Sequence, residues 1–256
     1  MGNGVNYSEI IAKIVIDASG KLLGRYVKKL EGAAKKLSIH FEIPFKEYLE
    51  KSYEKYSRVK TLLYNTEPKH IYSFFECNDF RYGSSTVEGL NVNNILELSR
   101  YILIQGSGGV GKSTMLKHFF ISCIEETGLI PLFFELKDIS FSEGYLEDEL
   151  YSRIVQLGFG LEKEYFLYAL KEGLFLILLD GIDEVPGNIL KDFISALDRL
   201  CDQYGENHFI VTSRPISDFI EYQRFTILKT IPFSKEKAMS LVRKLDYDPE
   251  IGRAHV

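Results

Sequence analysis

The sequence predicts a three-layer α/β fold with a five-stranded, mainly parallel sheet, preceded by a small all-α bundle at the N-terminus. Three observations predict this fold. Apolar runs and amphipathic segments alternate from residue 101 onward, which is typical of a parallel sheet covered on both faces. A glycine-rich stretch joins the first apolar run to the first helical segment of that region. Before residue 65, apolar side chains recur at helical spacing.

The predicted N-terminal helical bundle spans residues 1–70. Its first segment, from Ile10 to Leu37, carries apolar side chains on one face and lysines on much of the other. A second helix is expected to begin at Pro44, a residue favoured in a first helical turn, and to end near Asn65. The aromatic side chains of this helix are interpreted as core residues: Phe45, Tyr48, Tyr53 and Tyr56.

Charge is distributed unevenly along the chain. Residues 1–60 hold 12 Lys and Arg against 7 Asp and Glu, although the whole chain has a net charge of −5. The whole-chain balance therefore gives no general nucleic-acid signal. The basic segment is interpreted as a solvated helix surface, and contact with nucleic acid or anionic lipid through it stays open as the alternative.

Residues 71–98 are predicted to link the bundle to the sheet domain. Ile71–Phe75 alternates weakly between apolar and polar residues and is interpreted as a possible strand. Arg81–Glu88 is polar and is expected to form a loop. Val92–Leu98 predicts one or two helical turns that lead into the first strand of the sheet.

Residues 106–114 match the pattern G-x-x-x-x-G-K-[ST] between a predicted strand at Tyr101–Gln105 and a predicted helix at Lys112–Thr127. Glycines let the backbone turn tightly, so that successive N–H groups point at phosphate oxygens, and the helix adds its positive N-terminal end. Lys112 is expected to reach the β- and γ-phosphates, and the Ser113 hydroxyl to bind Mg²⁺. The predicted nucleotide-binding residues are Gly106, Ser107, Gly108, Gly109, Val110, Gly111, Lys112, Ser113 and Thr114.

Residues 99–230 are predicted to form one P-loop nucleotide-binding domain in which strands and helices alternate. Its further strands are expected at Ile130–Leu136, Leu174–Leu179, Phe209–Thr212 and Thr226–Leu228. Its further helices are expected at Leu146–Leu157, Lys163–Glu172, Asn188–Tyr204 and Asp218–Tyr222. Ser234 is a suitable N-cap for one more helix, which runs to Leu245.

Polar residues follow two of the predicted strands. Asp180 stands at the carboxyl end of the apolar run Leu174–Leu179, where ligands bind in such sheets and a Mg²⁺-holding carboxylate is expected. Either Asp183 or Glu184 is expected to orient or deprotonate the attacking water. Arg214 follows the next strand, whose end should lie beside Asp180, and a cation there can sense or stabilise a γ-phosphate.

Together these motifs resemble the NACHT group of STAND proteins, the signal-transducing P-loop ATPases with numerous domains. The resemblance covers about residues 99–245 and is strongest at Leu176–Glu184, which reads hydrophobics, Asp, a small residue, a hydrophobic residue and Asp-Glu. Ile130–Leu136 and Thr212–Pro215 are similar to that family's second strand and sensor strand. Ile231–Ser234 resembles the entry into its first helical domain.

The resemblance implies a switch in which bound ADP is exchanged for ATP, the protein associates with itself, and hydrolysis resets it. It assigns nucleotide and Mg²⁺ binding to the phosphate loop and Asp180, hydrolysis to Asp183 or Glu184, and recognition of the γ-phosphate to Arg214. Bacterial relatives are often linked to defence against phage, so an anti-phage role is expected. The trigger, the effector and the oligomer size are not predicted.

The family continues into further domains that this sequence does not contain. Residues 231–250 are therefore expected to be the start of a truncated helical domain. Ile251–Val256 resembles the translation of a sequencing-adapter stem and is interpreted as a tail foreign to the natural protein. Resequencing of the locus tests both expectations.

Two other functions stay open on the sequence alone. One is a stand-alone metabolic P-loop ATPase or kinase, and the other is an interaction module that binds nucleotide without hydrolysing it. The sequence has neither an N-K-x-D guanine signature nor an L-S-G-G-Q-type helix, which disfavours a GTPase and an ABC transporter ATPase. The widely spaced Cys77, Cys123 and Cys201 favour a cytoplasmic setting. The longest apolar run is too short to span a membrane.

Overall fold

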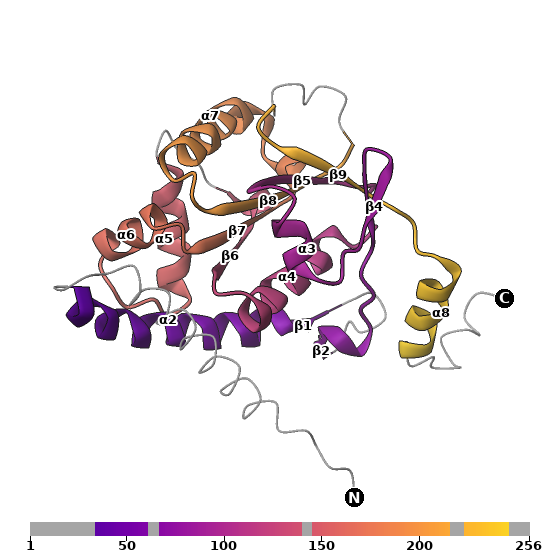
Figure 1. Cartoon of the computed structure of the whole chain (residues 1–256), viewed down its shortest axis with the longest axis horizontal. Helices are drawn as coiled ribbons and strands as arrows, with labels where there is room; N and C mark the ends of the chain where they lie inside the picture. The colour runs from indigo at the N-terminus through magenta and orange to yellow at the C-terminus, as the bar shows by residue number, and fades with distance from the viewer. Residues whose placement is uncertain (1–33, 61–66, 140–144, 216–222, 246–256) are drawn as a thin grey trace, which may run out of the picture.

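A central sheet organises the protein. The structure is a computed structural model, which describes residues 34–60, 67–139, 145–215 and 223–245. Helix α7 (Gly187–Gln203) covers one face of the sheet, and helix α4 (Lys112–Glu126) covers the other (Figure 1). Helix α2 (Ala34–Ser57) packs along α4 as a further layer.

Within the described residues the sheet has seven strands in the order β4-β3-β9-β5-β8-β7-β6. Five neighbouring strands are parallel, as predicted, and the inner ones are runs of apolar residues buried on both faces. They are β5 (Tyr101–Gln105), β6 (Ile130–Glu135), β7 (Phe175–Asp180), β8 (His208–Ser213) and β9 (Thr226–Thr230).

The order of the parallel strands brings separate motifs together. Strand β8 lies between β5 and β7, with Gln105 opposite Ser213 and Leu179 opposite Val211. The prediction that the end of β8 lies beside the end of β7 is therefore confirmed. Because parallel strands end at the same edge of a sheet, the residues that follow β5, β7 and β8 meet at one edge.

Strands β3 (Phe80–Tyr82) and β4 (Ser85–Val87) form an antiparallel hairpin that extends the sheet beyond β9. The predicted loop at Arg81–Glu88 and the predicted count of five strands are therefore wrong. The chain reverses at Gly83, whose φ of 57° lies in the left-handed region. Most side chains of the hairpin are exposed, so no apolar alternation reveals the two strands in the sequence.

The segment before the hairpin also differs from the prediction. The expected strand at Ile71–Phe75 is instead a 3₁₀ helix, η1 (Ile71–Ser73). Its start is held locally, because the Ser73 hydroxyl donates to the backbone carbonyl of His70 at 2.7 Å. The predicted helical turn at Val92–Leu98 is confirmed as α3 (Val92–Leu96).

Helix α2 contains Pro44 in its interior, so the predicted start at Pro44 is wrong. The helix also ends before the predicted end at Asn65, because Arg58–Val59 forms β1 and pairs with β2 (Lys69–His70). An interior proline removes one backbone hydrogen bond, and such a helix persists where tertiary packing supports it. Residues 10–33 of the predicted first segment lie outside the described residues.

The aromatic face of α2 enters the core of the sheet domain. The Phe45 ring lies 4.8 Å from that of Phe159, and the Tyr56 ring lies 4.9 Å from that of Phe120. The hydroxyl of buried Tyr48 donates to the carbonyl of Pro131 in β6 at 2.7 Å. The predicted core role of these aromatic residues is confirmed. The predicted domain boundaries stay predictions, and the described part of the bundle shares this core.

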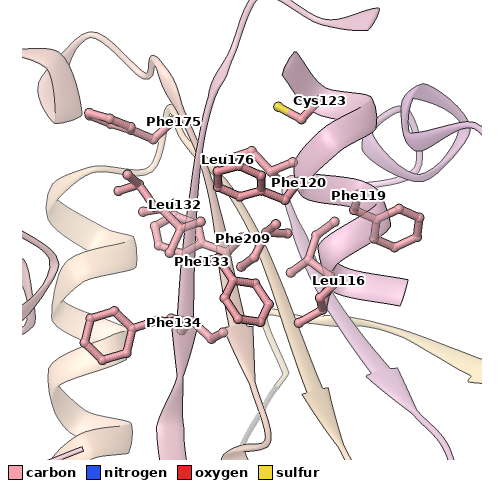
Figure 2. Packing of buried hydrophobic residues seen from close by; sticks show 14 of the residues in the cluster. Leu116, Phe119, Phe120, Cys123, Leu132, Phe133, Phe134, Phe175, Leu176 and Phe209 are labelled. Atoms are coloured by element: carbon pink, nitrogen blue, oxygen red, sulfur yellow. The ribbon is translucent and has the colours of Figure 1, made fainter. Parts of the chain in front are cut away.

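Side chains alternate across β6 to fill both layers. Phe133 points toward α4, where Leu116 and Phe120 lie, whereas Phe134 points to the opposite side (Figure 2). There the guanidinium of Arg153, in α5 (Leu146–Gln156), lies 4.8 Å from the Phe134 ring. An alternation of large apolar residues thus binds one strand to two helical layers.

The predicted helices α6 and α8 are confirmed. Helix α6 (Lys163–Lys171) packs against α5. Helix α8 (Lys235–Lys244) begins after Ser234, whose hydroxyl accepts a hydrogen bond from the Lys237 N–H at 3.3 Å, as the predicted N-cap should. The predicted helix at Asp218–Tyr222 and the predicted tail at Ile251–Val256 lie outside the described residues.

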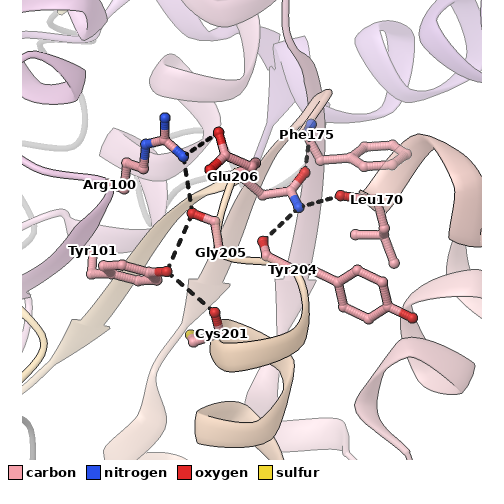
Figure 3. Close-up of polar contacts among 9 residues, drawn as sticks. Arg100, Tyr101, Leu170, Phe175, Cys201, Tyr204, Gly205 and Glu206 are labelled. Atoms are coloured by element: carbon pink, nitrogen blue, oxygen red, sulfur yellow. Dashed lines mark hydrogen bonds and ion pairs between the residues drawn. The ribbon is translucent and has the colours of Figure 1, made fainter. Parts of the chain in front are cut away.

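Asn207 joins three backbone segments at the amino end of the sheet. Its side chain is fully buried, and its Oδ1 accepts from the Phe175 N–H at 3.0 Å. Its Nδ2 donates to the carbonyls of Leu170 and Tyr204 at 2.7 and 2.8 Å. Figure 3 shows these bonds beside those of Arg100 and Tyr101 to the neighbouring loop.

Replacing Asn207 with alanine should lower the free energy of unfolding by about 2 kcal/mol. It leaves the buried Phe175 N–H without its partner, and it removes one of the two hydrogen bonds that each of the carbonyls of Leu170 and Tyr204 accepts. Urea denaturation measures this loss. The matched control is Asn188→Ala, at an exposed position of α7, which should change the free energy by less than about 0.5 kcal/mol. A loss below 1 kcal/mol in Asn207→Ala contradicts the expectation.

His118 in α4 is buried and neutral. Its Nε2 donates to the carbonyl of Leu90 at 2.8 Å, because a carbonyl can only accept, and its Nδ1 therefore accepts from the Tyr72 hydroxyl at 3.0 Å. Burial lowers the pKa of His118 below its usual value, and the carbonyl of Leu90 opposes this shift.

The lowered pKa of His118 predicts a loss of stability in acid. The unfolded chain takes up a proton near pH 6.5, before folded His118 does, so this stability is complete above about pH 6.5 and is lost as the pH falls toward the folded pKa. We expect the free energy of unfolding to fall between pH 7.5 and 5.5, and to fall less in His118→Gln. An equal fall in both proteins would exclude His118 as the source.

Candidate functional site

The loop between β5 and α4 has a backbone that other residues adopt poorly. Gly111 precedes α4 with a φ of 93°, in the left-handed region. Gly106 lies so close to β9 that a Cβ atom there would stand 2.5 Å from Thr230 Oγ1. The strand, the glycine loop and the helix together form the strand–loop–helix unit of P-loop proteins.

The first turn of α4 opens toward the edge of the sheet. The first N–H groups of a helix have no acceptor within the helix, and they carry its positive end. The first residues of α4, Lys112 to Thr114, line a cavity of about 230 Å³ at this point. A helix start and a glycine loop that face one cavity form a site suited to phosphate oxygens.

Lys112 folds back over the loop that precedes it. Its ammonium donates to the carbonyls of Gly106 and Ser107 at 2.8 and 3.1 Å. Burial lowers the pKa of Lys112, whereas the nearby carboxylates of Asp183 and Asp180 oppose this shift. The charge is thus held by two neutral acceptors, which a negatively charged ligand can replace.

Asp180 is oriented by the neighbouring strand. Its Oδ1 accepts from the hydroxyl of Thr212 at 2.7 Å, and the same hydroxyl accepts from the Gly181 N–H at 2.8 Å. Thr212 is fully buried in β8, so the packing around it restricts its side chain to one rotamer, which makes this contact. These bonds fix the carboxylate at the carboxyl end of β7 and leave Oδ2 for another partner.

Asp183 is engaged by Arg214. The Arg214 N–H donates to Asp183 Oδ1 at 3.0 Å, and the Arg214 Nε lies 3.3 Å from Asp183 Oδ2. The Asp183 side chain is 11% exposed, whereas that of Arg214 is 61% exposed. The side chain of Glu184 is exposed and makes no ion pair or hydrogen bond within the described part of the chain. The two acidic residues therefore differ in what they can still bind.

The cavity brings most of the predicted site residues together. Its walls combine the phosphate loop and the start of α4 with the residues that follow β7 and β8: Gly108, Gly109, Gly111, Lys112, Ser113, Thr114, Asp180, Gly181, Asp183, Glu184 and Arg214. The other predicted loop residues, Gly106, Ser107 and Val110, line a second cavity of about 460 Å³.

The second cavity also includes residues that the sequence reasoning missed. They are Gln105, Pro215, Lys229, Thr230 and Pro232. They stand at or just after the carboxyl ends of β5, β8 and β9, where open parallel sheets bind ligands. That position was the available signal, but it identifies these residues only once β9 is known to pair with β5.

The donor set of the first cavity suits a magnesium ion. The described residues contain no group of three His, Cys, Asp or Glu side chains that could hold a metal by themselves. Mg²⁺, however, is usually held by one or two protein oxygens, substrate phosphates and water. The Ser113 hydroxyl and the fixed Asp180 carboxylate supply such oxygens in one cavity.

Comparisons with known proteins find similarity among solved structures. No protein-family model and no curated protein matches the chain. Among solved structures, the chain is similar to PCH-2 of C. elegans, with 16% sequence identity and a TM-score of 0.35 over 59% of this chain. The match covers 42% of the PCH-2 chain, which is less than half of its length. None of the described helices is both long and apolar enough to cross a membrane.

Proposed function

We propose that this chain binds a nucleoside triphosphate with Mg²⁺, hydrolyses it slowly and acts as a nucleotide-dependent switch. One observation carries the proposal. Three motifs that are distant in the sequence, the phosphate loop, Asp180 and Arg214, line one cavity at the edge of a parallel sheet. Backbone N–H groups, an ammonium, a guanidinium and carboxylates are the groups that phosphoryl transfer requires.

The charges of the cavity favour a polyphosphate that arrives with a cation. Lys112 and Arg214 contribute two positive charges, while Asp180, Asp183 and Glu184 contribute three negative ones. A triphosphate alone would be repelled by these carboxylates. Bound Mg²⁺, held by Ser113 and Asp180, would neutralise phosphate charge. In this proposal Lys112 exchanges its two loop carbonyls for phosphate oxygens.

Glu184 is the proposed base for hydrolysis. Its carboxylate has no partner within the described residues and lines the same cavity, so it can accept a proton from a water that attacks the γ-phosphate. Asp183 is better suited to positioning Arg214, because both of its oxygens already face that residue. Arg214 would then stabilise the charge on the transferred group.

The switch part of the proposal rests on the resemblance of Leu176–Glu184 and Thr212–Pro215 to NACHT proteins. A switch of this kind exchanges ADP for ATP, associates with further copies and is reset by hydrolysis. Helix α8 follows the second cavity directly through Pro232, so a ligand in that cavity would touch the segment that leads to α8. An anti-phage role is the part of the proposal that rests on the resemblance alone.

Nucleotide titration tests the proposed function. Purified protein is first analysed for bound nucleotide and is then titrated with ATP and ADP in the presence and absence of Mg²⁺. We expect saturable binding that Mg²⁺ strengthens for ATP, and a larger particle in light scattering with ATP than with ADP. If the protein binds neither ATP nor ADP, the proposal is refuted. Binding without a change in size would refute the switch and retain the site.

A further inference from the structure

Positively charged side chains from three helices meet at the carboxyl end of β6. Within the described residues, β6 is the edge strand at one side of the sheet, and Phe133 and Phe134 point to its opposite sides (Figure 2). The ammonium of Lys117, in α4, lies 5.9 Å from the centroid of the Phe133 ring. The guanidinium of Arg153, in α5, lies 4.8 Å from the centroid of the Phe134 ring. The two cations thus flank the end of one strand.

Lys55, in α2, adds a third cation on the side of Phe133. Its ammonium lies 5.2 Å from the centroid of the Tyr56 ring, and the Tyr56 ring lies 4.9 Å from the Phe133 ring. Lys55, Lys117 and Arg153 are called the cation cluster from here on. A cation over an aromatic ring is attracted to the ring face, so each of these charges is held near the surface by a ring beneath it.

Glu135, the last residue of β6, lies among these charges without balancing them. Its carboxylate already pairs with Lys137 at 3.0 Å. Burial would raise the pKa of Glu135, but the hydrogen bond with Lys137 and the charges of Lys117 and Lys55 hold that pKa below its usual value. The members of the cation cluster make no ion pair and no hydrogen bond within the described residues. Their charges are therefore available to a ligand.

The surface of the cation cluster offers charge rather than apolar anchors. The rings of Tyr56, Phe133 and Phe134 are buried beneath the cations, so none of them is open to a stacking base or to an apolar side chain. Protein partners are bound mainly through buried aromatic and apolar anchors, and bases stack on exposed rings. Phosphates, in contrast, need only Lys and Arg side chains. The composition therefore favours a phosphate backbone over an acidic protein segment.

We propose that the cation cluster binds the phosphate backbone of a nucleic acid, without reading its base sequence. Lys55 belongs to residues 1–60, whose excess of Lys and Arg adds positive charge to the same part of the chain. The inference does not rest on the proposed function, because no member of the cation cluster lines either nucleotide cavity. The nucleic acid would still lie close to the first cavity, since Glu135 pairs in register with Asp180.

The salt dependence of nucleic-acid binding tests the proposal. The wild-type protein, without ATP, is titrated into a labelled oligothymidine of about 20 nucleotides, and fluorescence anisotropy gives the affinity at several salt concentrations. Three phosphate contacts predict that the logarithm of the affinity falls with that of the salt concentration with a slope of about −2 or steeper. Lys55→Gln, Lys117→Gln and Arg153→Gln should each weaken binding about 5-fold at about 0.1 M salt and make the slope shallower by about 0.7.

Controls separate these charges from charge in general and from the fold. Lys191→Gln and Arg199→Gln remove the same charges from exposed positions of α7, and they should leave the affinity unchanged. Lys117→Arg keeps the positive charge and should bind oligothymidine as the wild type does. A loss of affinity in Lys117→Gln that Lys117→Arg does not share is therefore a loss of charge and not of structure.

Three results would overturn the inference. The first is failure of the wild type to bind oligothymidine, and the second is an affinity that is unchanged in all three glutamine variants of the cation cluster. The third is competition by polyglutamate as strong as that by unlabelled oligothymidine, which would assign the cation cluster to an acidic protein segment. A protein that binds ATP but not oligothymidine loses only this inference, whereas one that binds oligothymidine but not ATP loses only the proposed function.

Discussion

Nucleotide affinity should fall at least about 100-fold when Lys112 is replaced with alanine. The ammonium now donates to two loop carbonyls, and in the complex it would donate to charged phosphate oxygens instead. Hydrogen bonds to charged groups contribute about 1.5–3 kcal/mol each, so the loss of one or two accounts for about 2.8 kcal/mol, or 100-fold. Calorimetric titration of both proteins with ATP and Mg²⁺ measures the change.

Lys191→Ala is the matched control for this experiment. Lys191 is exposed on α7, outside both cavities, so its loss removes the same charge without touching the site. Lys112 bonds only to loop carbonyls, and we therefore expect its removal to change the free energy of unfolding by less than about 1 kcal/mol. An unchanged Kd in a folded Lys112→Ala protein would exclude the phosphate loop as the binding site.

The sequence predicts the parallel strands well because their signal is local. Runs such as Phe175–Leu179 are apolar throughout, and such a short run bounded by polar or turn residues is typical of a strand buried on both faces. The β3–β4 hairpin has no such signal, because its residues are mostly exposed and it is held by pairing with β9, about 150 residues later. Pairing partners that distant in the chain leave no pattern in either segment.

The site also contains residues that the sequence identifies and residues that only the structure identifies. The phosphate loop, Asp180 and Arg214 are identified by motif and by their position after strands, and the structure places them in one cavity. Gln105 has no motif, and its place in the second cavity depends on the pairing of β9 with β5 and on the approach of Pro232. Whether Asp183 or Glu184 is free depends on the direction in which Arg214 points, which spacing alone does not determine.

Replacing Glu184 with glutamine should reduce the rate of ATP hydrolysis by about 100-fold or more while nucleotide binding is retained. General-base catalysis typically contributes about 10²- to 10⁴-fold, and glutamine keeps the shape of the side chain but cannot accept the proton. Phosphate release at saturating ATP measures the rate, and calorimetry measures the affinity. Glu54→Gln, at an exposed position of α2, is the control for a lost surface carboxylate.

Asp183→Asn separates the two acidic roles. Asparagine can still accept from the Arg214 N–H, but its amide nitrogen replaces the oxygen beside the guanidinium and carries no negative charge. We expect a smaller loss of rate than in Glu184→Gln, together with altered discrimination between ATP and ADP, because Arg214 is then less firmly held. A full loss of hydrolysis in Asp183→Asn, with normal rates in Glu184→Gln, would reverse the assignment. Asp183 would then have to release Arg214 before each turnover, and the ion pair in this structure would belong to a resting state.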